Sequence, residues 1–303
     1  MTAIPDAPVA LSTAQPSAER ARILALMNNP PVSRPTLVLA AVAFAGWLTI
    51  LAAAVAGALP APLAVALLTL AGYLTFTPMH DASHGSVGRS RWLNELTGRL
   101  AGVPLMAPFR AFRFAHLEHH RNTNDPARDP DMWSGGRFRL TLPLRWMTQD
   151  LHYYAFYFRH LASRPRDERV ETVVTLLALW GAAALAAASG HGREVLLFVV
   201  LPSRLAIGLL ACSFDWLPHA PHQVLGAEDR FRATLNVRWS AARPGRFLTP
   251  LLVSQNYHLV HHLFPGVPFY RYGAVWHARE RELVAKGAGH RTLRRASPAS
   301  SVV

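Results

Sequence analysis

The chain has 303 residues and a formal net charge of +13, and it is 51% hydrophobic but only 16% charged. That charged fraction is well below the roughly 25% of a typical soluble domain, which disfavours an ordinary soluble fold. The single cysteine, Cys212, excludes an intrachain disulfide, a cysteine-based zinc site and a resident iron–sulfur cluster. Residues 1–34 are polar and lack a continuous apolar run, so we expect no cleaved signal peptide.

The first predicted element is a membrane hairpin. No charged residue lies between Pro35 and Met79, a stretch that is too long for one membrane span and about right for two. Pro60 interrupts this stretch near its middle. The sequence therefore predicts transmembrane helices over about 36–58 and 62–80, joined by a turn that is too short to hold a domain.

Two weaker apolar segments follow the hairpin, at 100–116 and 148–161. The first carries Arg110 and Arg113, and the second is rich in aromatic residues. Arginines among apolar residues, and aromatic rings at headgroup depth, are typical of helices that lie in the membrane interface. We therefore expect two interfacial helices here.

A second membrane hairpin is predicted over 172–190 and 195–214. The first of these segments is uncharged, whereas the second contains Pro202 and Arg204. A charge at bilayer depth is costly and usually faces protein or water. We therefore expect a helix that is kinked at Pro202 and that directs Arg204 into the interior of the bundle.

The distribution of basic residues predicts the orientation in the membrane. Section 85–169 holds 14 arginines, and section 215–303 holds 11 arginines and the only lysine, whereas the two hairpin turns offer only Arg193. By the positive-inside rule, both basic sections face the cytoplasm. This topology and the attraction of arginine to anionic lipid account for the positive charge, so we predict no nucleic-acid partner.

The expected fold class is all-α and integral to the membrane. We predict four transmembrane helices in two hairpins, together with interfacial helices and a cytoplasmic cap that is rich in histidine. The chain is divided into a polar N-terminal tail (1–34), a membrane domain (35–285) and a disordered C-terminal tail (286–303).

Eight histidines lie in three short boxes, HDASH (80–84), HLEHH (116–120) and HLVHH (258–262). On a helix, positions i, i+3 and i+4 share a face, so each box presents its imidazoles together. All three boxes lie at or beyond the cytoplasmic end of the predicted bundle, where they can converge. Imidazole binds iron, zinc or copper, and eight ligands suit two ions better than one. The box residues are His80, His84, His116, His119, His120, His258, His261 and His262.

These boxes and their placement resemble those of the membrane fatty-acid desaturase and hydroxylase superfamily. The resemblance covers roughly residues 35–285 and implies a histidine-bound di-iron centre that activates O2 to attack a lipid C–H bond. Family members often supply a further histidine before the third box. In FDWLPHAPH, His219 is a better match than His222, because it follows the end of the last membrane helix more closely.

Side chains beside metal ligands commonly orient the imidazoles through hydrogen bonds. Four polar residues are expected in that role, namely Asp81, Asp125, Asp215 and Asn256. For Asp125, Asp129 and Asp131 the alternative is simple turn formation, which Asp-Pro sequences favour.

The sequences flanking the boxes bear on the substrate. HLEHHRNTNDPARDPDMW, DWLPH and HHLFPGVPFYRY resemble the desaturase-like β-carotene hydroxylase branch, which implies hydroxylation of a carotenoid ring. Acyl desaturases share parts of these flanks, so a fatty-acid desaturase is the alternative, and ketolase chemistry is a minor one. A histidine-rich metal transporter is disfavoured, because its ionisable ligands should lie near the midplane of the membrane.

The electron source is expected to be a separate protein. The chain has no segment resembling a fused haem domain, and one cysteine cannot hold an iron–sulfur cluster. A ferredoxin or a cytochrome b5-like protein would supply the two electrons. The arginine-rich cytoplasmic face suits an acidic partner of this kind.

Overall fold

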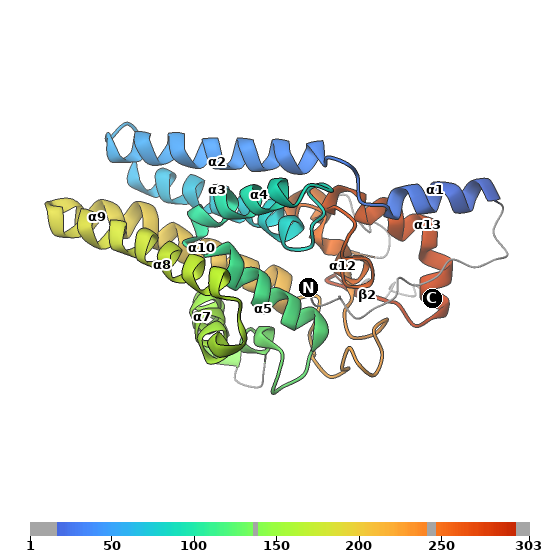
Figure 1. Cartoon of the computed structure of the whole chain (residues 1–303). Helices are drawn as coiled ribbons and strands as arrows, with labels where there is room; N and C mark the ends of the chain where they lie inside the picture. The colour runs from blue at the N-terminus through green and yellow to red at the C-terminus, as the bar shows by residue number, and fades with distance from the viewer. Residues whose placement is uncertain (1–16, 136–138, 241–246, 295–303) are drawn as a thin grey trace, which may run out of the picture.

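The computed structural model describes residues 17–135, 139–240 and 247–294, and this part of the chain is predominantly helical (Figure 1). Within it, three helical segments are long and apolar enough to cross a membrane: α2 (Arg34–Val55), α3 (Ala61–Ser83) and the continuous run Arg166–Trp216. The first two form the hairpin that the uncharged N-terminal stretch predicts. The all-α membrane fold is therefore confirmed.

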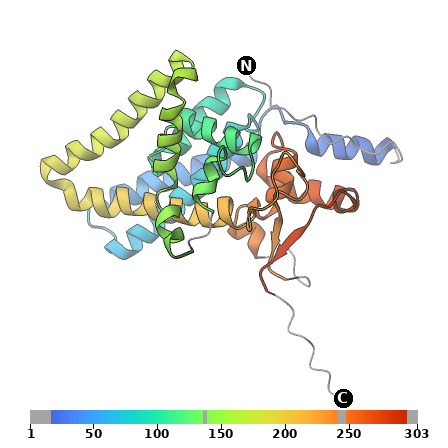
Figure 2. The same ribbon diagram turned by 90° about the horizontal axis from the view of Figure 1, so that it is seen from below.

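The run Arg166–Trp216 is itself a hairpin. Gly190 has a φ of 96°, a conformation that glycine adopts without steric cost, and the helix reverses there. Figure 2 shows α8 (Arg166–Ala186) running out to this turn and α10 (Leu201–Leu210) running back. Both predicted membrane hairpins are therefore present. The connecting elements are η5 (Ala187–His191), α9 (Gly192–Val195), η6 (Leu196–Val200) and, after α10, η7 (Ala211–Trp216).

The predicted helix bounds differ from the observed ones in two informative places. α3 continues to Ser83, so His80 lies in its last turn rather than at its end, and His84 is its C-cap residue. In the second hairpin, Pro202 lies in the first turn of α10 and follows the π-helical η6. The helix is therefore continuous through Pro202, with a wider π turn before the residue that lacks an N–H.

Arg204 lies where the sequence predicts, inside the bundle. Its guanidinium makes two hydrogen bonds of 2.6 Å to the carboxylate of Asp150 on α7 (Gln149–Arg159), and its side chain is only 15% exposed. A bidentate pair is the strong form of this interaction, and it neutralises the charge at bilayer depth.

The section between the hairpins contains more and shorter helices than predicted. Its described elements are α4 (Arg91–Gly102), η1 (Val103–Leu105), α5 (Phe109–Arg121), η2 (Pro130–Trp133), η3 (Arg139–Thr141), α6 (Leu142–Trp146), α7 and η4 (Leu161–Ser163). The single helix expected over 100–116 was wrong. Pro104 and Pro108 cannot donate helical hydrogen bonds, and Met106 adopts a φ of 57°, so the chain turns before α5 begins.

Helix α4 was not predicted, and its two faces differ. Trp92, Leu96 and Leu100 are exposed at helical spacing, as an interfacial helix requires. On the other face Glu95 is buried and forms ion pairs with arginines of α4 and α5. The segment that forms α4 is short and contains charged residues, so its amphipathic pattern was not recognised in the sequence.

The cap joins the C-terminal third of the chain to its N-terminus. Its described elements are β1 (Asn236–Arg238), α11 (Leu248–Leu251), η8 (Gln255–Tyr257), α12 (His258–Leu263), η9 (Phe269–Arg271), α13 (Tyr272–Ala285) and β2 (His290–Thr292). Helix α1 (Ser17–Met27), inside the predicted polar tail, lies beside α13 (Figure 1). Arg271 holds the end of α1 by donating to the carbonyls of Ala25, Leu26 and Asn28.

The prediction of a disordered tail from residue 286 was wrong for its first part. β2 pairs in parallel with β1, with Asn236 opposite His290 and Arg238 opposite Thr292. These backbone pairs bring together segments more than fifty positions apart, which local composition does not reveal. The rest of the predicted tail, 295–303, lies outside the described residues.

Candidate metal centre

Four segments bring histidines to one place at the junction of the membrane helices and the cap. The last turn of α3 carries the first box, α5 carries the second and α12 carries the third. The loop after η7 adds His219. Because both HxxHH boxes are helical, their side chains project from rigid elements rather than from loops.

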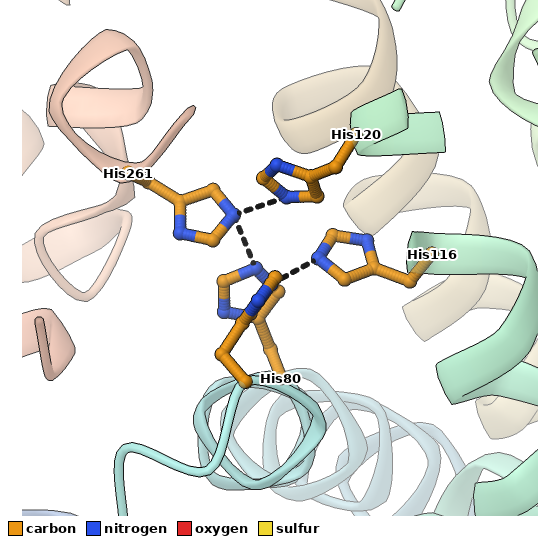
Figure 3. Close-up of side chains that lie close together, drawn as sticks. His80, His116, His120 and His261 are labelled. Carbon is orange, nitrogen blue, oxygen red and sulfur yellow. Dashed lines mark hydrogen bonds between the residues drawn. The ribbon is translucent and has the colours of Figure 1, made fainter. Parts of the chain in front are cut away.

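The first histidine group consists of His80, His84, His116, His120 and His261, whose ligand nitrogens all lie within 4.8 Å of one another. The Nε2 atom of His261 lies 3.0 Å from that of His80 and 2.8 Å from that of His120. His84 and His116 face each other with their Nε2 atoms 2.8 Å apart. Figure 3 shows His80, His116, His120 and His261 converging from three separate helices.

The second histidine group consists of His119, His219, His258 and His262, again within 4.8 Å of one another. The Nε2 atom of His258 lies 3.0 Å from that of His219 and 3.1 Å from that of His262. His262 in turn lies 3.2 Å from His119, Nε2 to Nε2. The additional histidine chosen from the sequence, His219, is thus beside the box residues.

Both groups can accommodate a metal ion. A neutral imidazole has one N–H, yet the Nε2 atom of His261 faces two other Nε2 atoms, and so does that of His258. Converging lone pairs are stabilised by a cation between them. An ion with metal–nitrogen bonds of about 2.1 Å would hold neighbouring ligand atoms about 3 Å apart, which matches these separations.

In the second group, His119 has a hydrogen-bond partner on the ring nitrogen that faces away from the group. His119 Nδ1 lies 2.9 Å from Asp129 Oδ1 and 3.3 Å from Asp131 Oδ2. Asp131 also accepts a 2.6 Å hydrogen bond from the hydroxyl of Tyr153. A carboxylate on Nδ1 fixes the tautomer of the imidazole and leaves Nε2 free to bind metal.

In the first group, His261 has a similar but weaker hydrogen-bond partner on its outward ring nitrogen. His261 Nδ1 lies 3.1 Å from the hydroxyl of Tyr272, and both side chains are fully buried. With the proton on Nδ1, the imidazole donates to the phenolic oxygen and directs Nε2 inward. A neutral acceptor orients the ring less strongly than a carboxylate does.

The protonation of the two groups follows from burial and from the carboxylates. Burial lowers the pKa of His84 to about 3. Burial likewise lowers the pKa well below its ordinary value for His116, His120, His219, His258, His261 and His262. These imidazoles are therefore neutral at pH 7, which is the form that binds metal.

His119 is the exception. Burial lowers its pKa, but the adjacent Asp129 and Asp131 outweigh that effect and raise the pKa to about 9. Without a metal ion, the two buried carboxylates thus favour the imidazolium, as opposite charges within hydrogen-bond distance do; a cation bound at Nε2 would displace the proton there and leave the one at Nδ1. Carboxylates thus contact a ligand of the second group directly, whereas the buried carboxylate next to the first group, Asp81, bonds to Thr36 and Phe269.

The sequence assigned supporting roles to four residues, and their positions differ. Asp125 accepts hydrogen bonds from the backbone of Ala127 and Arg128 and pairs with the guanidinium of Arg128. It therefore forms the turn that was its alternative role, and this does not match the support predicted for a ligand. Asp129 and Asp131, four and six residues further on, make the contact with His119 instead.

Asp81 and Asp215 are buried close to the histidines but bond to other groups. Asp81 accepts from the hydroxyl of Thr36 at 2.8 Å and from the backbone N–H of Phe269, so it ties α2 and α3 to the cap. Asp215 accepts from Ser134 at 3.2 Å. Asn256, also buried, donates to the carbonyl of Val237 at 3.5 Å and joins the third box to β1.

Sequence reasoning left the roles of Asp129 and Asp131 open and missed those of Tyr153 and Tyr272. The RDPDM motif after the second box carried a signal, since it places two acids within one turn of each other. The tyrosines carried none, because each meets the site only through the tertiary packing of α7 or α13.

Two cavities adjoin the centre. A narrow apolar slot of about 50 Å³ lies between α3, α5, α7 and α10, with Phe76, Phe112, Leu210 and Asp215 in its walls. Phe76 stacks on His80 and Phe112 on His116, at ring separations of 5.7 and 5.5 Å. A larger open pocket of about 440 Å³ is lined by His84, His120 and His262.

This fold and site define an integral membrane protein whose histidine centre can bind metal. A model of the fatty acid desaturase family matches residues 56–294, and the chain therefore belongs to this family. The resemblance inferred from the histidine boxes is confirmed.

Individual relatives differ in their named substrates. The chain is 28% identical over 226 residues to an sn-1 oleoyl-lipid 12-desaturase of Synechocystis sp., covering 64% of this chain and 61% of that protein. It is 34% identical over 202 residues to a beta-carotene ketolase of Paracoccus sp., covering 65% and 71%. It is 28% identical over 234 residues to a dihydrorhizobitoxine desaturase of Bradyrhizobium elkanii, covering 69% and 64%. The match spans about three fifths of the length of the oleoyl-lipid 12-desaturases.

Proposed function

We propose that this protein is a membrane-bound di-iron oxidoreductase that hydroxylates the ring of a carotenoid such as β-carotene. The observation that carries the proposal is the convergence of nine imidazoles beside an apolar slot between membrane helices. Hydroxylation inserts one oxygen atom of O2 into a C–H bond and reduces the other to water, consuming two electrons and two protons.

The first histidine group would hold one iron and the second group the other. When bound, the two irons supply the activation of O2 that an unactivated C–H bond requires. Neutral nitrogen ligands suit iron, and the three boxes offer them from the helices α3, α5 and α12. Asp129 holds the proton of His119 at Nδ1, so that Nε2 stays available to the metal.

The slot positions the hydrocarbon and keeps water away. Phe76 and Phe112 form the wall between the slot and the first group, and each stacks on a ligand imidazole. Their rings also contact each other edge to face at 5.6 Å. A dry, aromatic wall favours an apolar substrate, and the membrane helices α3 and α10 provide its route from the bilayer.

The choice of a carotenoid rests on the flanks of the boxes and on one relative. The beta-carotene ketolase is 34% identical to this chain over 202 residues, against 28% over longer stretches for the two desaturases compared above. Acyl-chain desaturation is the second candidate, because several relatives are named as oleoyl-lipid or omega-3 lipid desaturases. Both reactions draw on the same centre and the same two electrons.

The centre would face the cytoplasm, where the arginine-rich sections of the chain lie under the positive-inside rule. The electrons would come from a separate protein of the ferredoxin or cytochrome b5 type. One relative, similar over 54 residues at 37% identity, is named as a ferredoxin-dependent omega-3 desaturase of Nostoc. The single cysteine of this chain supports an external donor.

Product analysis in two hosts tests the proposal. One host makes β-carotene, the other contains saturated and monounsaturated acyl lipids, and both co-express a ferredoxin and its reductase. A hydroxylated carotenoid that disappears in His116→Ala supports the proposal. A new double bond in the acyl chains with unchanged carotenoid establishes the second candidate instead.

A further inference from the structure

The cap carries an exposed surface that the proposed chemistry leaves unexplained. The parallel ribbon β1–β2 ends in two apolar residues, Trp239 and Leu293, which are 43% and 41% exposed. The backbone N–H of Arg294 donates to the carbonyl of Trp239, and that of Leu293 donates to the carbonyl of Arg238. We call the ribbon surface the set Arg238, Trp239, Arg291, Leu293 and Arg294, of which Trp239, Leu293 and Arg294 are exposed and the other two are half-buried.

The ribbon surface is basic as well as apolar. Arg238 donates to the hydroxyl of Thr292 at 2.9 Å, and Arg291 donates to the carbonyl of Ala220. Neither of these partners carries a charge, so the positive charge of both guanidinium groups is retained. An exposed tryptophan surrounded by arginines is the composition that protein interfaces favour.

Hydrogen bonds connect the ribbon directly to the second histidine group. The backbone N–H of Leu235 donates to the carbonyl of Pro218 at 2.9 Å, next to His219. Arg291 donates to Ala220 on the other side of the same histidine. Two hydrogen bonds thus link the ribbon segments to the residues on either side of His219.

A further connection leads to the third box. Asn256 donates to the carbonyl of Val237 in β1, and it lies two residues before His258. Both routes end on residues within two positions of a ligand of the second group, His219 or His258. Contiguous bonded contacts of this kind are the physical paths that couple a surface to a buried site.

We propose that the ribbon surface is the docking site of an acidic one-electron carrier protein, which delivers electrons to the second histidine group. This inference rests on the proposed function. The carrier would be oxidised by one electron at each of two encounters. The two electrons, with two protons and O2, balance the formation of one hydroxyl group and one water. Charge complementarity would guide the encounter.

The position of the ribbon fits a water-soluble partner. Figures 1 and 2 both show it in the cap, away from the turn that joins α8 and α9. Under the topology predicted by the positive-inside rule, the ribbon surface would lie on the cytoplasmic side of the membrane. The large pocket beside His84 is a weaker docking site, because Arg121, one of the two arginines that line it, pairs with Glu118.

The test measures binding separately from turnover. The detergent-solubilised holoprotein is titrated with an acidic [2Fe–2S] ferredoxin, comparing wild type with Arg238→Glu/Arg294→Glu. The matched control is Arg20→Glu/Arg22→Glu, which makes the same charge change on exposed positions of α1. Because Arg238 also bonds within the ribbon, Arg294→Glu and Trp239→Ala are measured as single variants.

We expect the dissociation constant for ferredoxin to rise about tenfold or more in the double variant, with a weaker dependence on salt. Iron content should remain unchanged, and so should the product yield when a small chemical reductant replaces ferredoxin. The α1 control should bind as wild type does. Trp239→Ala should weaken binding without changing its salt dependence.

Three results would overturn the inference. The ribbon variants could bind ferredoxin as tightly as wild type, or the α1 control could lose as much affinity as they do. Alternatively, ferredoxin binding could persist while binding to phosphatidylglycerol vesicles is lost, which would assign the surface to anionic lipid. If ferredoxin binding depends on the ribbon but no lipid product forms with any reductant, the proposed function fails while the docking site stands.

Discussion

The two histidine groups are built from shared boxes but have different surroundings. The first group contains five imidazoles, and one of them, His261, has the neutral hydroxyl of Tyr272 beside its Nδ1 atom. The second contains four, and the carboxylates of Asp129 and Asp131 support it through His119. Two aromatic rings of the slot stack on ligands of the first group, whereas the ribbon bonds to residues beside ligands of the second group. Tyr153, which also lines the slot, bonds to Asp131 beside His119. The difference suggests a division between the substrate side and the electron side.

Each HxxHH box is divided between the groups in a reciprocal way. The i and i+4 residues of the second box, His116 and His120, belong to the first group, while its i+3 residue, His119, belongs to the second. In the third box the assignment is reversed, because His261 joins the first group. Side chains at positions i and i+4 of a helix point in nearly the same direction, and the side chain at i+3 points to the adjacent side of that helix. Neither group can therefore form unless α5 and α12 pack together.

The largest expected effect comes from removing one ligand from each group. We predict that His120→Ala and His262→Ala each lower the iron content from about two toward one per chain and reduce product more than about 100-fold. Elemental analysis and product quantification measure the two effects. His152→Ala is the control, since that ring stacks on Trp133 outside both groups. Unchanged iron in either ligand variant would contradict the division into two sites.

Blocking the slot should affect the substrate without affecting the metals. Leu210 lines the slot, while its neighbour Leu209 is exposed on the outside of α10. We predict that Leu210→Trp lowers product about tenfold or more because the larger ring fills the cavity, and that iron content stays the same. Leu209→Trp should behave as wild type. Equal activity of the two variants would show that substrate does not use the slot.

Removing the carboxylate beside His119 should weaken the second group selectively. We predict that Asp129→Asn lowers iron affinity or activity about 10- to 100-fold, the usual effect of losing such a partner. Asp125→Asn, in the same loop but bonded to Arg128, should have no comparable effect. Iron titration of both proteins measures the difference. If the two variants lost iron equally, the loop rather than the Asp129 contact would be responsible.

The smallest effect is expected at the first group. Tyr272→Phe removes the hydroxyl beside His261 Nδ1, a neutral hydrogen bond worth about 1 kcal/mol, or about fivefold in iron affinity. Tyr270→Phe, a tyrosine of η9 whose ring lies beneath Arg271, is the matched control. Iron titration is again the measurement. An effect larger than that of Asp129→Asn would reverse the proposed difference between the groups.

The sequence predicted the features that depend on local pattern. Uncharged stretches and arginine-rich sections defined the two hairpins, because membrane insertion depends on the residues of each segment. The boxes and their placement predicted that these histidines would converge at one end of the bundle, and His219 followed from the resemblance. Even so, the spacing alone suggested that each box acts as one unit.

The missing features all depend on contacts between distant segments. The reciprocal division of the boxes requires the relative rotation of α5 and α12, which no single helix encodes. β2 exists because β1 is there to pair with it, and its sequence on its own resembled a polar tail. Likewise, the support of His119 by Asp129 rather than Asp125 is decided by how the loop after α5 folds back.

The central claim is that two histidine groups hold two iron ions in unequal environments. The most direct measurement is Mössbauer spectroscopy of the purified ⁵⁷Fe-enriched protein, combined with iron quantification and repeated for Asp129→Asn. We predict about two irons per chain and two distinct iron signals, each typical of iron with mainly nitrogen ligands. Asp129→Asn should alter one of these signals. A single iron per chain, or two signals that shift equally in the variant, would contradict the account.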